Sequence, residues 1–102
     1  MMMKEAMAAY DLAVRTDPDS AWAYNNRGNA YRRSGRYHNA LLDYNQAIRL
    51  APQLAEAYAG RAFIYTLLSK DKEARDDVSR AVELGFKPAL IESEIEGLMK
   101  RR

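Results

Sequence analysis

The sequence predicts an all-α fold of about six helices, built from repeated helical hairpins. Three observations support this fold class. Identical residues recur at a spacing of 34 positions, apolar residues recur at three- and four-residue steps, and glycine or proline interrupts these stripes at regular intervals. A period of this length is typical of stacked units that each bury an apolar face only against a neighbour.

The repeat is clearest when residues 21–54 are aligned with residues 55–88. Nine positions are then identical: Ala21/Ala55, Ala23/Ala57, Tyr24/Tyr58, Arg27/Arg61, Tyr31/Tyr65, Ala40/Ala74, Asp43/Asp77, Ala47/Ala81 and Leu50/Leu84. The same shift matches the N-terminal stretch at Ala6/Ala40, Tyr10/Tyr44, Ala13/Ala47, Arg15/Arg49 and Pro18/Pro52. We therefore expect one helical-repeat domain over residues 1–102, made of a half repeat (1–20), two full repeats (21–54 and 55–88) and a closing helix (89–102).

The first two predicted helices cover residues 3–16 and 20–33. Pro18 separates them, because proline cannot continue a helix, and Ser20 or Asp19 is a favourable N-cap for the second. The apolar face of the second helix is formed by Ala21, Tyr24, Gly28 and Tyr31.

Four further helices are predicted, over residues 37–50, 54–68, 71–84 and 88–101. Gly35 precedes the first of these and is able to adopt the left-handed conformation that ends a helix. Pro52 lies just beyond its end, where it stops the helix. One repeat later Phe86 replaces this proline, and Gly85 and Pro88 supply the break instead.

These residues resemble the tetratricopeptide-repeat family, whose pattern places an aromatic residue, Leu-Gly, Tyr, Ala, an aromatic residue, Ala and Pro at fixed offsets. The first full repeat supplies Tyr24, Arg27-Gly28, Tyr31, Ala40, Tyr44, Ala47 and Pro52. The second supplies Tyr58, Arg61-Ala62, Tyr65, Ala74, Val78 and Ala81. The resemblance covers the whole chain and implies a right-handed α-α superhelix of tetratricopeptide-type helical hairpins.

Both full repeats carry an arginine where the family pattern has leucine, namely Arg27 and Arg61. Both also carry an aspartate in the second helix, Asp43 and Asp77, at the same offset. We predict that each arginine lays its stem along the helix interface and pairs with one of these carboxylates. The alternative is that the arginines face a ligand.

Small residues recur where paired helices are expected to cross. They are Gly28, Ala62, Ala40, Ala74, Ala47 and Ala81. A larger side chain at such a position pushes the two backbones apart, so we expect Gly28→Leu to destabilise the fold by overpacking.

Composition and motifs argue against an enzyme. The net charge of +2 is too small to indicate nucleic acid or an anionic membrane as a partner, and there is no cysteine for a thiolate or a metal cage. His38 has no neighbour in sequence at metal-ligand or triad spacing, and the glycines form no phosphate-binding loop. We expect no catalytic residue, no metal and no cofactor, and a cytoplasmic protein by default because no targeting segment is visible.

The resemblance also implies a binding surface, because the first helix of each repeat lines the concave side of the family's superhelix. This groove would hold a peptide or a helix of a partner protein. The ligand-binding residues carried over in this way are Trp22, Asn25, Asn26, Asn29, Arg32 and Arg33 in the first repeat and Phe63 and Thr66 in the second. For Phe63 we prefer the alternative that the closing helix folds over it.

The residue types of the first repeat suit a peptide ligand. Asn25, Asn26 and Asn29 offer donors and acceptors to an extended backbone, and Arg32 and Arg33 suit a carboxylate. Trp22 is a rigid aromatic of the kind that anchors interfaces. The alternative is a polar, solvated helix face.

A subset of the family grips the C-terminal carboxylate of chaperone tails with lysine, asparagine and further basic residues. Only Asn29 matches that arrangement here, while Asn25, Gly60, Leu90 and Glu94 depart from it. The resemblance therefore disfavours a clamp of this kind.

We expect a non-catalytic protein–protein interaction module, a scaffold or adaptor. The alternatives are an RNA-binding helical repeat and an accessory segment of a larger protein. Nucleic acid is disfavoured because base-stacking aromatic residues are not interleaved with the arginines. The N-terminal helix lacks a first-helix partner, so we expect Met3, Met7, Tyr10 and Val14 to be partly uncovered. This edge predicts either a homodimer or truncation from a longer repeat protein, and no membrane partner is expected.

Overall fold

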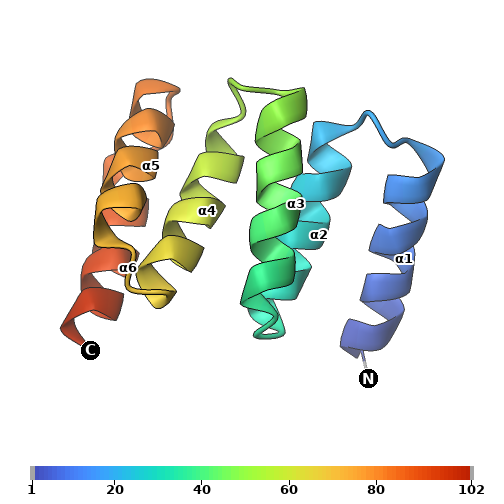
Figure 1. Ribbon diagram of the computed structural model, residues 1–102, viewed down its shortest axis with the longest axis horizontal. Coiled ribbons are helices and arrows are strands. Elements are labelled where there is room, and N and C mark those ends of the chain that lie inside the picture. The colour runs from blue at the N-terminus through green and yellow to red at the C-terminus, as the bar shows by residue number, and fades with distance from the viewer. Residues whose placement is uncertain (1, 102) are drawn as a thin grey trace. The chain divides into compact units, whose positions relative to one another are not determined.

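The computed structural model describes residues 2–101, apart from the side chains of residues 2, 3 and 90. The chain forms two compact units, Met1–Pro52 and Gln53–Arg102 (Figure 1). The described residues of each unit form three helices and contain no strand. The division into a half repeat, two repeats and a closing helix stays a prediction.

The first unit contains α1 (Met2–Thr16), α2 (Ala21–Arg33) and α3 (Tyr37–Leu50). Helix α2 contacts α1 and packs most extensively against α3. The Oγ atom of Ser20 accepts a hydrogen bond from the backbone N–H of Ala23 at 3.2 Å, which confirms Ser20 as the N-cap of α2. Gly35 takes a φ of +80° in the turn before α3.

The second unit contains α4 (Ala55–Leu67), α5 (Asp71–Glu83) and α6 (Pro88–Lys100). Helix α4 packs most extensively against α5, and α6 contacts both of them. Ser69, at the position equivalent to Gly35, also takes a positive φ of 60°, a conformation that side chains rarely adopt. Each of the six helices lies within one residue of its predicted range at either end.

The predicted small residues do lie in the tightest part of the packing. The alanines at these positions, Ala40, Ala47, Ala62, Ala74 and Ala81, are fully buried. A Cβ atom on Gly28 would lie 3.0 Å from Cε1 of Tyr44, closer than such atoms normally approach. In the first unit the large ring of Tyr44 thus faces Gly28. At the equivalent positions of the second unit the smaller Val78 replaces the tyrosine and the larger Ala62 replaces the glycine.

The predicted pairing of Arg27 is confirmed. Its Nε and Nη2 atoms donate to the two carboxylate oxygens of Asp43 at 2.8 and 2.9 Å, and its Nη1 donates to Asp11 at 3.2 Å. The guanidinium also lies 5.9 Å from the ring centre of Tyr24 and 5.7 Å from that of Tyr31. The hydrogen bond with Asp43 raises the pKa of Arg27, although burial acts in the opposite direction.

The second unit repeats this arrangement. Arg61 donates from Nε and Nη2 to the two oxygens of Asp77, each at 2.8 Å. Its guanidinium lies 5.6 and 5.5 Å from the ring centres of Tyr58 and Tyr65. Each arginine thus joins the two helices of one hairpin, so the pairs contribute to the fold and the ligand-facing alternative is not needed to explain them.

Candidate functional site

One face of α2 carries four of the eight predicted binding residues. Trp22, Asn26, Asn29 and Arg33 follow one another at steps of four, three and four residues, so they share one side of the helix. Trp22 is 52% exposed, Asn26 and Arg33 are exposed, and Asn29 is half-buried. We refer to these four residues as the α2 stripe.

Asn29 is held by a residue from the next helix. The hydroxyl of Tyr44 donates a hydrogen bond to Oδ1 of Asn29, and the Tyr44 side chain is fully buried between the helices. Because the amide oxygen is engaged, the amide is oriented and its Nδ2 donors are turned away from that contact. Tyr44 therefore positions the central polar group of the stripe.

Two arginines and the carboxylate of Asp43 act on the Tyr44 hydroxyl that makes this hydrogen bond. Burial raises the pKa of Tyr44 above its ordinary value, and the positive charges of Arg32 and Arg33 partly oppose that rise. Arg32 is half-buried and Arg33 is exposed. The two guanidinium groups thus act on the same hydroxyl that holds the Asn29 amide, and guanidinium groups and amide N–H donors are the kind of groups that bind carboxylates.

Asn25 lies elsewhere. It is only 2% exposed, and its Oδ1 atom has no hydrogen-bond partner among the described residues. A polar group buried in this way is not presented to a ligand from solvent, and an unsatisfied acceptor costs stability. Asn25 is therefore not part of the α2 stripe, whereas Asn26 and Asn29, the other two predicted asparagines, belong to it.

The two predicted residues of the second unit also differ from each other. Phe63 is half-buried and occupies the position equivalent to Asn29. Thr66 is 1% exposed, and its hydroxyl donates to the backbone carbonyl of Ala62 at 2.9 Å. Helix α6 packs on α4 with Ile91 and Ile95 buried, as expected for a closing helix. The side chain of Leu90, which departs from the pattern of the chaperone-tail clamp, lies outside the described residues.

Sequence reasoning missed two residues that shape the first unit. In the sequence Tyr44 stands out only as an aromatic residue of the repeat pattern, because helical spacing gives no sign of what its hydroxyl contacts. Asp11 was not assigned at all, although its carboxylate accepts a hydrogen bond from Arg27. The repeat gave no signal for Asp11, because the equivalent residues are Asn45 and Ser79.

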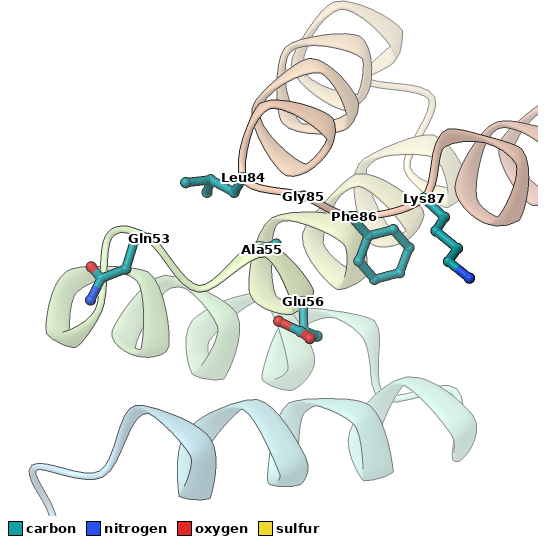
Figure 2. Close-up of a pocket in the computed structure, with 7 residues that line it drawn as sticks. All are labelled: Gln53, Ala55, Glu56, Leu84, Gly85, Phe86 and Lys87. Atoms are coloured by element: carbon teal, nitrogen blue, oxygen red, sulfur yellow. The ribbon is translucent and has the colours of Figure 1, made fainter.

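A cavity of about 310 Å³ lies in the second unit, between the start of α4 and the segment that joins α5 to α6 (Figure 2). Its lining residues are Gln53, Ala55, Glu56, Leu84, Gly85, Phe86 and Lys87. None of them belongs to the predicted binding set. The cavity is open to solvent, and its charged side chains are one acid, Glu56, and one base, Lys87. This lining indicates no particular ligand.

No group of three or more metal-ligating side chains occurs within residues 2–101. His38 is exposed at the start of α3. Among the helices described above, none is long and apolar enough to cross a membrane.

Comparison with known families finds two matches. The tetratricopeptide repeat matches residues 21–54, and a second pattern described as TPR repeat matches residues 3–35. No curated protein sequence matches the chain.

Several solved structures are similar over most of the chain. The first TPR of Spaghetti (RPAP3), bound to the HSP90 peptide SRMEEVD, is 27% identical with a TM-score of 0.87, over 98% of this chain and 79% of that one. The second TPR domain of human RPAP3, in complex with the HSP70 peptide SGPTIEEVD, is 30% identical with a TM-score of 0.80, over 94% and 80%. The Arabidopsis OM64 TPR domain is 23% identical with a TM-score of 0.87, over 99% and 84%, and shows the fold alone. The predicted all-α helical-repeat fold class is confirmed.

Proposed function

Because the chain belongs to the tetratricopeptide-repeat family, we propose that it is a non-catalytic interaction module that binds a peptide or helix of a partner protein. The RPAP3 domains described with HSP90 and HSP70 peptides support a peptide ligand. A scaffold or adaptor role follows from peptide binding, since binding is the only activity that the described side chains suggest. The cytoplasm is the compartment that the sequence favours.

The proposed ligand is an acidic peptide segment lying along the α2 stripe, on the face that the family resemblance predicts to be concave. The observation that carries this proposal is the hydrogen bond from Tyr44 to Asn29. It orients an amide so that its donors are available to a carboxylate or a peptide carbonyl. Arg33 adds an exposed guanidinium one turn further along the helix.

Each residue of the stripe has a role in this proposal. Trp22 packs against an apolar side chain of the peptide, and Asn26 bonds to the peptide backbone. Asn29 and Arg33 bind an acidic side chain together. Arg32 strengthens the positive potential from its half-buried place.

The other predicted binding residues receive supporting roles. Asn25 and Thr66 are buried within their own units, so they shape the helices that carry the surface. Phe63 is proposed as an apolar contact of the second unit.

The fluorescence of Trp22 offers a direct assay, because it is the only tryptophan in the chain. The probe is the heptapeptide SRMEEVD, whose methionine and adjacent glutamates suit Trp22 and the Asn29–Arg33 pair. We expect saturable binding by this peptide and none by the charge-reversed SRMKKVK. The C-terminally amidated form should bind within about twofold of the free acid, because Asn29 is the one residue of this sequence that matches the terminal-carboxylate clamp.

Variants then locate the site. Asn29→Ala and Arg33→Ala should each weaken binding about tenfold, whereas Arg49→Ala, an exposed arginine of α3 outside the stripe, should have no effect. Tyr44→Phe keeps the ring but releases Asn29, so it should weaken binding by a smaller factor. Equal binding of both peptides, or full binding by Asn29→Ala, would contradict the proposal. Displacement of the peptide by an unrelated RNA would favour the RNA-binding alternative.

A further inference from the structure

The turn that joins α2 to α3 carries a cluster of arginines with no acidic neighbour in the sequence (Figure 1). Residues 20–42 contain four arginines and neither aspartate nor glutamate. The first of the four, Arg27, is held by the carboxylate of Asp43. The other three lie within five consecutive residues at the end of α2 and in the turn, and they are Arg32, Arg33 and Arg36.

Two of these arginines have no counter-charge within the protein. Arg33 and Arg36 are exposed, and neither forms an ion pair with any described residue. The next acid along the chain is Asp43, whose side chain is only 7% exposed and accepts two hydrogen bonds from Arg27. An anion from outside the protein is therefore the group that would compensate both positive charges.

Backbone hydrogen bonds bring these two arginines to either side of a closed turn. The N–H of Gly35 donates to the carbonyl of Arg32 at 3.2 Å, and the N–H of Arg36 donates to the carbonyl of Tyr31 at 2.9 Å. This pattern is the common way to end a helix with a glycine of positive φ. The chain thus turns back directly after Arg33, and Arg36 follows immediately before α3.

The second unit shows that such a turn forms without the two arginines. The turn between α4 and α5 is closed by equivalent backbone hydrogen bonds, of 3.0 and 2.8 Å. There Leu67 stands in place of Arg33, and Lys70 stands in place of Arg36. Because the turn itself needs only one positive charge or none, the arginine pair of the first unit is available to bind a ligand.

We propose that the acidic peptide of the α2 stripe is a phosphopeptide, and that Arg33 and Arg36 bind its phosphoryl group at the turn between α2 and α3. The inference rests on the proposed function, since Arg33 belongs to both the stripe and the turn. A phosphomonoester carries close to two negative charges and three acceptor oxygens, so it pairs with two guanidinium groups at once. A carboxylate, with a single charge, would leave one of the two arginines unmatched.

A peptide fits the surroundings of this turn better than a membrane does. Anionic membranes are typically bound by clusters of about four to eight basic residues, more than the turn provides. None of the exposed large apolar side chains among the described residues lies in the turn. The turn instead continues into the α2 stripe, whose amides and tryptophan suit a peptide backbone and an apolar side chain.

Helix geometry indicates where the phosphate belongs in the peptide. Arg33 follows Trp22 by eleven residues, which is about 16 Å along α2. An extended peptide covers this length in about five residues. In the octapeptide SRMEEVDS, with its methionine at Trp22 and its chain parallel to α2, the last serine therefore reaches the turn. The first serine lies beyond Trp22, on the side away from the turn.

Three forms of this octapeptide test the proposal on the full chain through the fluorescence of Trp22. All are C-terminally amidated; one is unmodified, one is phosphorylated on the last serine and one on the first. The two phosphopeptides have the same composition and charge, so they differ only in where the phosphate lies. Phosphorylation of the last serine should tighten binding about tenfold, and phosphorylation of the first serine should change it by no more than about twofold.

Variants of the protein assign this gain to the turn. Arg36→Gln should reduce the tenfold gain to about twofold or less, and Arg36→Lys should keep only part of it because lysine lacks the paired donors. Arg49→Gln, in an exposed arginine of α3 outside the turn, should leave the full gain. Arg36 makes no side-chain capping hydrogen bond, so thermal unfolding should show that Arg36→Gln folds normally. Analytical ultracentrifugation excludes a contribution from the predicted homodimer through the N-terminal edge.

Several outcomes would overturn the phosphate site. These are equal affinities for all three peptides, an equal gain from either phosphate, or the full gain in Arg36→Gln. Displacement of the phosphopeptide by inorganic phosphate at about the peptide's own concentration would show a site for free phosphate instead, and displacement by an unrelated RNA would show a nucleic-acid site. The unmodified peptide tests the proposed function separately. If it does not bind, the proposed function fails, whereas selective binding of the peptide phosphorylated on its last serine would still support the phosphate site.

Discussion

The carboxylate of Asp43 accepts two hydrogen bonds from the guanidinium of Arg27 and thereby joins α3 to α2. The aspartate side chain is 7% exposed and that of the arginine 21%. Both charges are thus largely removed from water, and each depends on the other for its hydrogen bonds. The family's usual leucine at the arginine position would need no such partner.

Asp43→Ala should therefore lower the free energy of unfolding by about 1–3 kcal/mol, because it leaves Arg27 with only Asp11 as a partner. The double variant Arg27→Leu/Asp43→Ala should recover much of this loss, since no buried charge remains. Urea denaturation measures both values. Asp76→Ala removes the partner of Lys72 in a fully exposed pair and should cause no measurable change. A double variant less stable than Asp43→Ala would contradict this account.

Gly28→Leu should destabilise the protein by about 1–3 kcal/mol, because even its Cβ atom would meet the Tyr44 ring at 3.0 Å. Gly97→Ala is the matched control. Its Cβ atom would meet only the end of the flexible Arg101 side chain, at 3.9 Å. It should stabilise α6 by about 0.5–1 kcal/mol through helix propensity, as thermal unfolding would show. An unchanged melting temperature for Gly28→Leu would mean that the α2–α3 crossing is not tightly packed.

Alkaline pH should reveal the burial of Tyr44. Its pKa is raised in the folded protein above the ordinary value of 10.0, so the folded state keeps a proton that the unfolded chain has already lost. Stability should be unaffected below about pH 10 and should fall as the pH rises further. Tyr44→Phe should remove the loss of stability that Tyr44 causes above this pH, while any loss caused by the other tyrosines stays. Denaturant midpoints of both proteins at pH values on either side of 10 would test it, and parallel curves would contradict it.

Asn25→Leu should stabilise the protein by about 1–2 kcal/mol. The substitution keeps the number and branching of the side-chain heavy atoms and removes a buried acceptor that has no partner among the described residues. Chemical denaturation would measure the gain. A loss of stability would contradict this account.

Local patterns in the sequence were sufficient for the helices and for their pairing within each hairpin. The 34-residue period, the apolar stripes and the breaks at Pro18, Gly35 and Pro52 placed every helix to within one residue. The recurrence of arginine and aspartate at one offset predicted the pairs Arg27–Asp43 and Arg61–Asp77. These features depend on neighbouring or repeated residues, which a single sequence displays directly.

The tertiary structure decided which polar side chains are presented to solvent. Asn25 and Asn26 are adjacent in sequence, but helix geometry turns them by about 100° relative to each other, so one is buried and the other exposed. The hydroxyl of Tyr44 orients Asn29, and Val14, which the sequence predicts to be partly uncovered, is only 8% exposed because α1 contacts α2. Such roles depend on which residue lies across the helix interface. The sequence alone predicts that residue only where the same pair recurs in both repeats, as it does for arginine and aspartate.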